Sequence, residues 1–168
     1  MGASPWAGGR YESVAERIAG IAEQTVGAAD RRHPLRGATL VDLACGTGSA
    51  ALAAAVRGAR VTGVDLTPEL IAIGERKAEA AGHTVNWVTA DAAHTGLSAG
   101  TFDAVVSNMG IIFVDPDLQV AEISRLLKPH GVLAFSSWVR SWQQSLLRPD
   151  RSGARHPAED WVHPRPVG

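Results

Sequence analysis

Apolar residues recur at steps of three and four early in the chain and gather in short runs after that. The steps of three and four extend from Tyr11 to Val26 and predict an amphipathic helix, followed by a loop over residues 28–37. Short apolar runs then alternate with helix-like segments. The runs predicted to be strands are 38–44, 60–65, 85–89, 102–107 and 132–137, and the predicted helices between them are 49–57, 68–81 and 117–127.

This alternation of strand and helix predicts a mainly parallel sheet with helices on both faces. Right-handed crossovers then give an α/β fold of three layers, a Rossmann-like doubly wound sheet. The expected domain covers residues 1–147, with its core in 38–138. The residues expected to face inward from the last predicted helix are Leu118, Ala121, Ile123, Leu126 and Leu127.

Composition changes this picture little. With 168 residues and 45% hydrophobic residues, the chain suits a single globular domain. The formal net charge of -1 offers no basic surface for nucleic acid, and no apolar run reaches the ~18 residues of a membrane span. The single cysteine, Cys45, excludes an internal disulfide, and the histidines show no metal-ligand pairing. We therefore expect a cytoplasmic protein without a metal site.

Glycines and acids follow the predicted strands. In an open parallel sheet, ligands bind beyond the carboxyl ends of the strands. After the first strand, Gly46 and Gly48 permit a tight turn and a close approach of a ligand to the backbone. Asp42, four residues before Gly46, can help to hold a cationic amino group, either through water or by fixing the loop backbone. A strand-end acid that caps the next helix is the alternative role for Asp42.

The next strand ends supply groups for a nucleoside. Asp65 lies 19 residues after Gly46, where a carboxylate can accept both ribose hydroxyls, and Leu66 can cover an adenine ring. After the third strand, Asp91 can accept from an adenine amino group while the N–H of Ala92 donates to a ring nitrogen. Asn108 and Met109 follow the fourth strand and are expected to face the reactive end of the ligand.

The glycine pattern alone does not choose between cofactors. With Ala51, it also satisfies the looser GxGxx(G/A) form of NAD enzymes, and the spacing of Asp65 suits both. Adding Asp42, Asp91-Ala92, the run 102–108 and the run 127–131 makes the chain resemble the class I S-adenosylmethionine (SAM)-dependent methyltransferases, particularly the small-molecule branch. The resemblance covers about residues 38–138.

The resemblance implies a role for each position. It places the methionine part of SAM on the glycine loop, the ribose on the acid after the second strand and the adenine at the acid after the third. The cofactor-binding residues implied are Tyr11, Asp42, Ala44, Cys45, Gly46, Thr47, Gly48, Asp65, Leu66, Asp91, Ala92, Asn108 and Met109. Cys45 is interpreted as a small turn residue rather than a nucleophile, and His94 as a solvated loop residue rather than a general base. The sequence assigns no catalytic residue.

The C-terminal part departs from the family pattern, which has two more strands. Residues 148–168 contain four prolines and neither alternation nor a helical stripe. They indicate either a shortened variant or a frame-shifted or truncated remnant. The fifth strand would then be an uncovered edge, which favours a homodimer. The expected function is methyl transfer from SAM to a small molecule. An inactive SAM-binding module and, more weakly, an NAD-binding oxidoreductase remain the alternatives.

Overall fold

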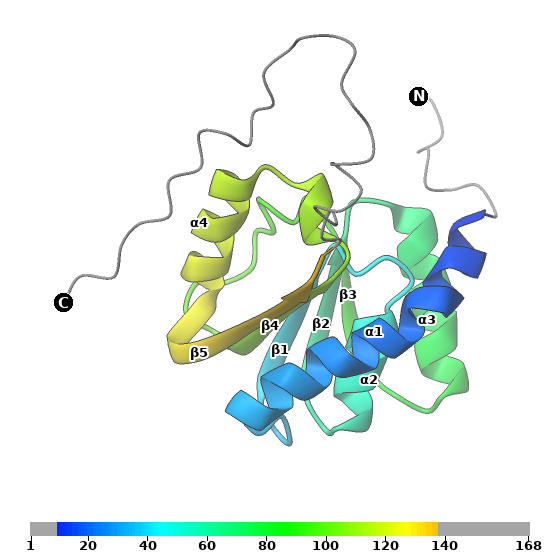
Figure 1. Ribbon diagram of the computed structural model, residues 1–168, viewed down its shortest axis with the longest axis horizontal. Helices are drawn as coiled ribbons and strands as arrows, with labels where there is room; N and C mark the ends of the chain where they lie inside the picture. The colour runs from blue at the N-terminus through cyan, green and yellow to red at the C-terminus, as the bar shows by residue number, and fades with distance from the viewer. Residues whose placement is uncertain (1–9, 138–168) are drawn as a thin grey trace, which may run out of the picture. The chain divides into compact units, whose positions relative to one another are not determined.

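Five parallel strands form the centre of the protein, seen in a computed structural model that describes residues 10–137, with side chains from Gly20 onward. Their order in the sheet is β3-β2-β1-β4-β5 (Figure 1). The bounds are β1 Thr39–Leu43, β2 Arg60–Asp65, β3 Val85–Thr89, β4 Phe102–Asn108 and β5 Leu127–Ser136. The predicted Rossmann-like α/β fold is confirmed, and β5 is an edge strand within the described sheet.

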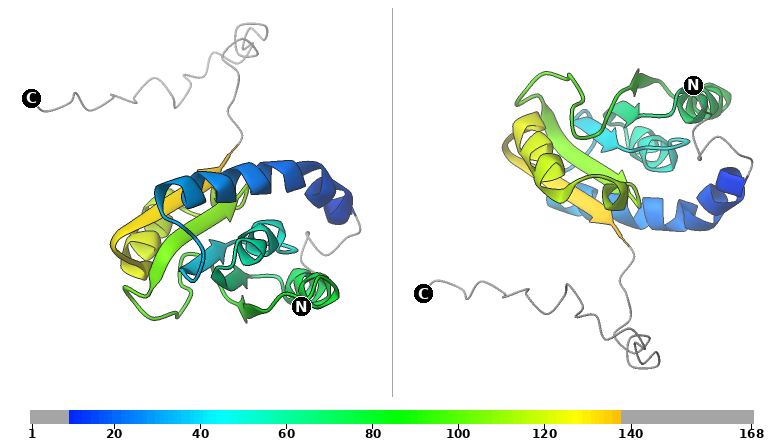
Figure 2. Two further views of the ribbon diagram at one scale, coloured as in Figure 1. Left: turned by 90° about the horizontal axis from the view of Figure 1, so that it is seen from below. Right: turned by 90° about the horizontal axis from the view of Figure 1, so that it is seen from above.

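Helices cover both faces of the sheet. Their bounds are α1 Arg10–Arg32, α2 Ser49–Val56, α3 Pro68–Ala80 and α4 Pro116–Leu126, with the short 3-10 helix η1 at Ile111–Phe113. One buried cluster joins α1, α2 and α3 to the sheet, and a second joins α4 to the other face. Figure 2 shows α1 and α4 on opposite sides of β4 and β5. No helix within residues 10–137 is long and apolar enough to cross a bilayer.

The first helix is longer than predicted. It continues through residues 28–32, which the sequence pattern had placed in a loop. Ala29 in this extension is 1% exposed and belongs to the core. Asp30 accepts a hydrogen bond from the backbone N–H of Leu35 at 2.9 Å and so fixes the exit of the helix. Burial of Ala29 and this side-chain contact therefore extend the helix beyond its apolar stripe.

The inward face of α4 differs from the prediction. Ile123 and Leu126 are buried as expected, whereas Leu118 and Ala121 are exposed. Two polar side chains, Gln119 and Glu122, are buried on this helix instead. The error has a physical cause, because these polar side chains bind backbone groups of the loop that follows β3.

The fifth strand begins at Leu127 rather than at Val132. Its pairing with β4 shifts register between the pairs Phe102–Leu127 and Ala104–Val132. His130, expected in a turn before the strand, lies within this irregular part at a φ of 65°. The Pro129-His130-Gly131 segment is thus an irregularity inside β5 rather than a turn that precedes it.

Candidate cofactor site

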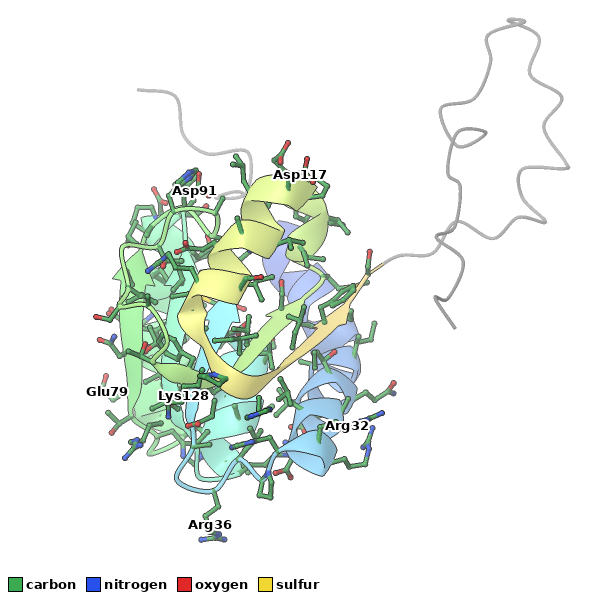
Figure 3. The ribbon with its side chains drawn as sticks, turned by 90° about the vertical axis from the view of Figure 1, so that its left-hand side faces the viewer. Arg32, Arg36, Glu79, Asp91, Asp117 and Lys128 are labelled. Carbon is green, nitrogen blue, oxygen red and sulfur yellow. The ribbon has the colours of Figure 1, made fainter. Side chains whose placement is uncertain are left out.

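The carboxyl ends of the strands lie at one end of the sheet. Figure 3 shows Asp91, which follows β3, at that end, whereas Arg36, which precedes β1, lies at the opposite end. Asp103 belongs to the end near Arg36, where it accepts hydrogen bonds from the backbone and hydroxyl of Thr39 and from Lys128, each at 2.8 Å. These contacts hold the pKa of Asp103 well below its usual range, with the hydrogen bond from Lys128 as the main cause. Asp103 is therefore structural.

The loop after β1 adopts left-handed backbone conformations. Gly46 and Gly48 have φ values of 56° and 80°, and Ala44, which carries a Cβ, has 53°. Such a conformation costs free energy at a non-glycine residue and is common where a backbone is shaped for a ligand. The N–H of Cys45 donates to the carbonyl of Val64 at 2.9 Å. The loop is thus a fixed turn, joined to β2, rather than a free connection.

Asp42 lies under this loop and is fully buried. Its Oδ2 accepts a hydrogen bond of 2.9 Å from the N–H of Ala51 in the first turn of α2. Its Oδ1 is buried and has no hydrogen-bond partner among the described residues. Burial raises the pKa of Asp42 to about 8; the Ala51 N–H partly offsets this, and the charge of Asp65 adds to it. One oxygen therefore fixes the backbone and the other is left to bind a further donor.

Asp65 bridges two backbone segments. Oδ2 accepts from the N–H of Gly46 at 2.8 Å, and Oδ1 accepts from the N–H of Thr67 at 2.9 Å. Each carboxylate oxygen can accept more than one hydrogen bond, so these contacts leave capacity for ribose hydroxyls. Leu66, next in the chain, is 69% exposed. An exposed leucine beside Asp65 provides an apolar surface of the kind a base can contact.

The segment after β3 places its two predicted residues differently. The Asp91 side chain is about half exposed, and its Oδ1 accepts from the N–H of Ala93 at 2.8 Å. Ala92 is 5% exposed and packs in the cluster on the α4 face. His94 lies 3.9 Å from Asp91 and is itself mostly exposed, in agreement with a solvated loop residue. Asp91 is therefore available to a ligand at the surface.

Polar side chains of α4 hold this segment, and sequence reasoning missed them. Gln119 donates to the carbonyl of Ala92 at 3.3 Å, and Glu122 accepts from the N–H and hydroxyl of Thr95. Arg125 donates to Glu122 at 2.7 Å and to the carbonyl of Leu97. The hydrogen bond from Arg125 lowers the pKa of Glu122 to about 2. The sequence signal that could have found them is the spacing of Gln119 and Glu122, three residues apart and therefore on one face of the predicted helix 117–127.

The residues after β4 are tied to the edge strand. Asn108 Oδ1 accepts from the hydroxyl of Ser136 at 2.8 Å, and the N–H of Met109 donates to the same hydroxyl at 3.1 Å. Met109 is 8% exposed and has a φ of 62°. A Cβ on Gly110 would lie 2.6 Å from the Cβ of Ala44, so the turns after β1 and β4 are in close contact. The Asn108 side chain is therefore engaged with β5 through its oxygen.

The remaining residues predicted for the site are Thr47, Cys45 and Tyr11. Thr47 is 2% exposed, and the Nζ of Lys77 lies 3.4 Å from its hydroxyl. Burial raises the pKa of the Cys45 thiol well above its usual range, which argues against a nucleophilic thiolate. The backbone of Tyr11 lies in α1, and its side chain is outside the described part.

Comparison with known proteins identifies the family. Residues 41–135 match the model of a methyltransferase domain, and this segment contains every site residue discussed above except Tyr11 and Ser136. Because the match covers more than half of the chain, the protein belongs to the class I SAM-dependent methyltransferase family.

The relatives match different shares of the chain. An uncharacterised protein of Mycobacterium tuberculosis is 36% identical over 94% of this chain, which spans 61% of that relative. A demethylmenaquinone methyltransferase of Thermus thermophilus is 42% identical over 56% of this chain and 44% of its own. A solved geranyl diphosphate methyltransferase, in complex with GPP and sinefungin, has a TM-score of 0.62 at 32% identity, covering 68% of this chain and 42% of its own.

These coverages bear on the C-terminal residues. The chain spans less than two thirds of the length of these relatives. A match to 94% of this chain nevertheless has to include most of residues 138–168, which lie outside the described residues. Shared sequence with a relative in that region counts against the frame-shift hypothesis.

Proposed function

We propose that this chain binds SAM across the carboxyl ends of β1, β2 and β3 and transfers its methyl group to a small-molecule acceptor. The observation that carries the proposal is the buried Oδ1 of Asp42, which has no partner among the described residues. A buried, unpaired carboxyl oxygen is costly unless a donor fills the position. The cationic amino group of SAM supplies such a donor, directly or through one water molecule.

The remaining residues fit the other parts of SAM. The turn over residues 44–48 presents backbone without bulky side chains to the methionine part. Asp65 retains acceptor capacity for the ribose, while Leu66 and Asp91 offer an apolar surface and an acceptor for adenine. The sinefungin in the geranyl diphosphate methyltransferase is a SAM analogue, which supports the same choice of cofactor.

The chemistry of methyl transfer lies largely in the cofactor. SAM supplies a methyl group made electrophilic by the attached sulfonium. The protein has to hold the cofactor still, align the acceptor atom and exclude water. The contacts of Asp42 and Asp65 with backbone N–H groups give the loop this rigidity. The buried carboxyl of Asp42 neutralises the amino group when it ionises.

An NAD-binding oxidoreductase is disfavoured by the same residues. A pyrophosphate at the glycine turn is an anion without donors of its own, so it would leave the buried Oδ1 of Asp42 without a donor, and its negative charge would oppose ionisation of that carboxyl. Two of the relatives are named for the acceptors demethylmenaquinone and geranyl diphosphate, which are small molecules. Their names support a small acceptor here and leave its identity open.

An inactive SAM-binding module is the second candidate, and the coverage of the relatives favours it. The chain spans 61% of its mycobacterial relative, so any acceptor contacts made by the unmatched part of that protein have no counterpart in the matched sequence. The test is release of S-adenosylhomocysteine from SAM in the presence of a panel of small acceptors. Acceptor-dependent release supports transfer. SAM binding with no release for any acceptor supports the inactive module.

A further inference from the structure

The indole ring of Trp87 occupies a slot whose walls are three glycines from three different elements. Gly63 is the register partner of Trp87 on the neighbouring strand β2. Gly74 lies in α3, and Gly48 is the N-cap of α2, at the end of the glycine loop. Trp87 itself is half-buried on β3 and packs against the core on the α1 face. The ring therefore lies between β2, α3 and the glycine loop over residues 44–48.

None of the three glycines has room for a side chain. A Cβ at Gly63 would lie 2.8 Å from Cε3 and Cζ3 of Trp87, and a Cβ at Gly74 would lie 2.7 Å from Cη2. At Gly48 a Cβ would overlap Cη2. Packed interiors tolerate such overlap only by moving backbone or side chains. The position of the indole is thus fixed from three sides.

We propose that Trp87 is a positioning residue for the cofactor. Its indole packs against Gly48 and so sets the position of the glycine loop, residues 44–48, relative to the methionine part of SAM. This inference rests on the proposed SAM-binding function. It assigns a positioning role to a tryptophan that packs against the loop.

Residues at both ends of the loop lie close to this ring, so its position affects both. Gly48 contacts the indole directly and begins α2, whose first turn contains the Ala51 N–H that Asp42 binds. At the other end, Cys45 Sγ would lie 3.3 Å from a Cβ at Gly63, so it borders the same slot. A shift of the indole towards Gly48 therefore displaces the loop relative to Asp42.

Gly74→Ala tests the proposal with a minimal change. Gly74 lies in helix α3 and has no left-handed φ, so alanine fits its backbone, and the three atoms nearest to a built Cβ all belong to the indole. We expect the dissociation constant (Kd) of SAM to rise about tenfold, the size of effect that modest overpacking produces. The Kd of 5′-methylthioadenosine, which lacks the amino-acid part, should change less than about twofold, since the methionine part lies against the loop whereas Asp65, Leu66 and Asp91 are expected to hold the ribose and adenine.

Two further variants separate positioning from loss of fold. Adding Trp87→Phe to Gly74→Ala replaces the indole by a smaller ring, so the double variant should bind SAM more tightly than Gly74→Ala alone. Gly20→Ala is the matched control, because Gly20 lies in α1 and, among the described residues, no atom outside its own stretch of helix lies within 4 Å of a built Cβ; its SAM affinity should equal that of the wild type. Thermal unfolding establishes that each variant is folded.

The outcomes are distinct. If Gly74→Ala weakens SAM and 5′-methylthioadenosine equally, or if Trp87→Phe gives no rescue, Trp87 has only a packing role and the proposal is wrong. Should Gly74→Ala fail to fold, Trp87→Phe alone decides, because loss of support under Gly48 must weaken SAM more than 5′-methylthioadenosine. A wild-type chain that binds no SAM would instead refute the proposed function, and this inference with it.

Discussion

Oδ2 of Asp65 accepts a hydrogen bond of 2.8 Å from the backbone N–H of Gly46, so the acid at the end of β2 is joined directly to the turn after β1. The second oxygen accepts from the N–H of Thr67 at the start of α3. Asp65 thus organises the loop besides being the expected ribose acceptor. These two roles make its substitution a sharp test of the site.

Asp65→Ala should weaken SAM binding by at least ~1.5 kcal/mol, as expected when charge-assisted hydrogen bonds are lost. The control is Asp103→Ala, which removes a carboxylate at the opposite end of the sheet and should lower the melting temperature without changing SAM affinity. Isothermal titration with each variant gives the measurement. Equal SAM affinity in Asp65→Ala and wild type would remove Asp65 from the site.

The raised pKa of Asp42 leads us to expect that the affinity for SAM depends on pH. Its folded-state pKa of about 8 lies above the ordinary 3.8, so in the free protein the carboxyl stays protonated at neutral pH. Pairing with the cationic amino group of SAM requires it to ionise, and binding therefore releases a proton. Between about pH 5.5 and 7 the SAM Kd should fall up to about tenfold per pH unit. Asp42→Asn should lose this slope, and a flat wild-type profile would contradict the assignment.

The same shift has a consequence for stability, with a defined sign. A group whose folded pKa is raised stabilises the fold fully below its unfolded pKa, and this contribution is lost as pH rises through the folded pKa. For Asp42 the free energy of unfolding should therefore decrease from about pH 4 to about pH 8 relative to Asp42→Asn. Urea unfolding of the two proteins across this range measures the difference, and parallel curves would be the contrary result.

The lowered pKa of Glu122 leads us to expect the opposite pH dependence of stability in acid. Its pKa is lowered to about 2, so its contribution is present above the ordinary value of 4.5 and is lost as pH falls towards 2. Glu122→Ala leaves the N–H of Thr95 without its acceptor and should cost about 2 kcal/mol at neutral pH. Denaturant unfolding at pH 7 and pH 3 should show a smaller penalty at the lower pH. An equal penalty at both would be inconsistent with an ionised Glu122.

The sequence predicted the succession of strands and helices along the chain, because the periodicity of apolar residues reflects which side of each element is buried. It could not predict the inward face of α4, where Gln119 and Glu122 are buried because they bind backbone groups far away in sequence. The role of Trp87 was also hidden, since its contacts with Gly48 and Gly74 come from three separate elements. Asp42, Asp65 and Asp91 could be predicted as site residues because each lies near the carboxyl end of a predicted strand. Their hydrogen-bond partners required the three-dimensional structure.

The edge strand predicts self-association, which we propose occurs through β5. Leu133 and Phe135 are 39% and 52% exposed on this strand, and an open apolar edge favours pairing with another chain. Phe135→Lys should shift the protein towards monomer in light scattering at high concentration. Val56→Lys, at a residue 65% exposed in α2, is the matched control and should leave the association unchanged. A wild-type protein that is monomeric throughout would refute the proposal.

We propose that the turn at residues 44–48, with Asp42 beneath it and Asp65 beside it, is a SAM site. Isothermal titration of the full chain with SAM and, separately, with NAD tests it most directly. We expect saturable one-to-one binding of SAM, weakened in Asp65→Ala, and markedly weaker binding of NAD. Tighter binding of NAD, or no binding of SAM by the folded protein, would contradict it.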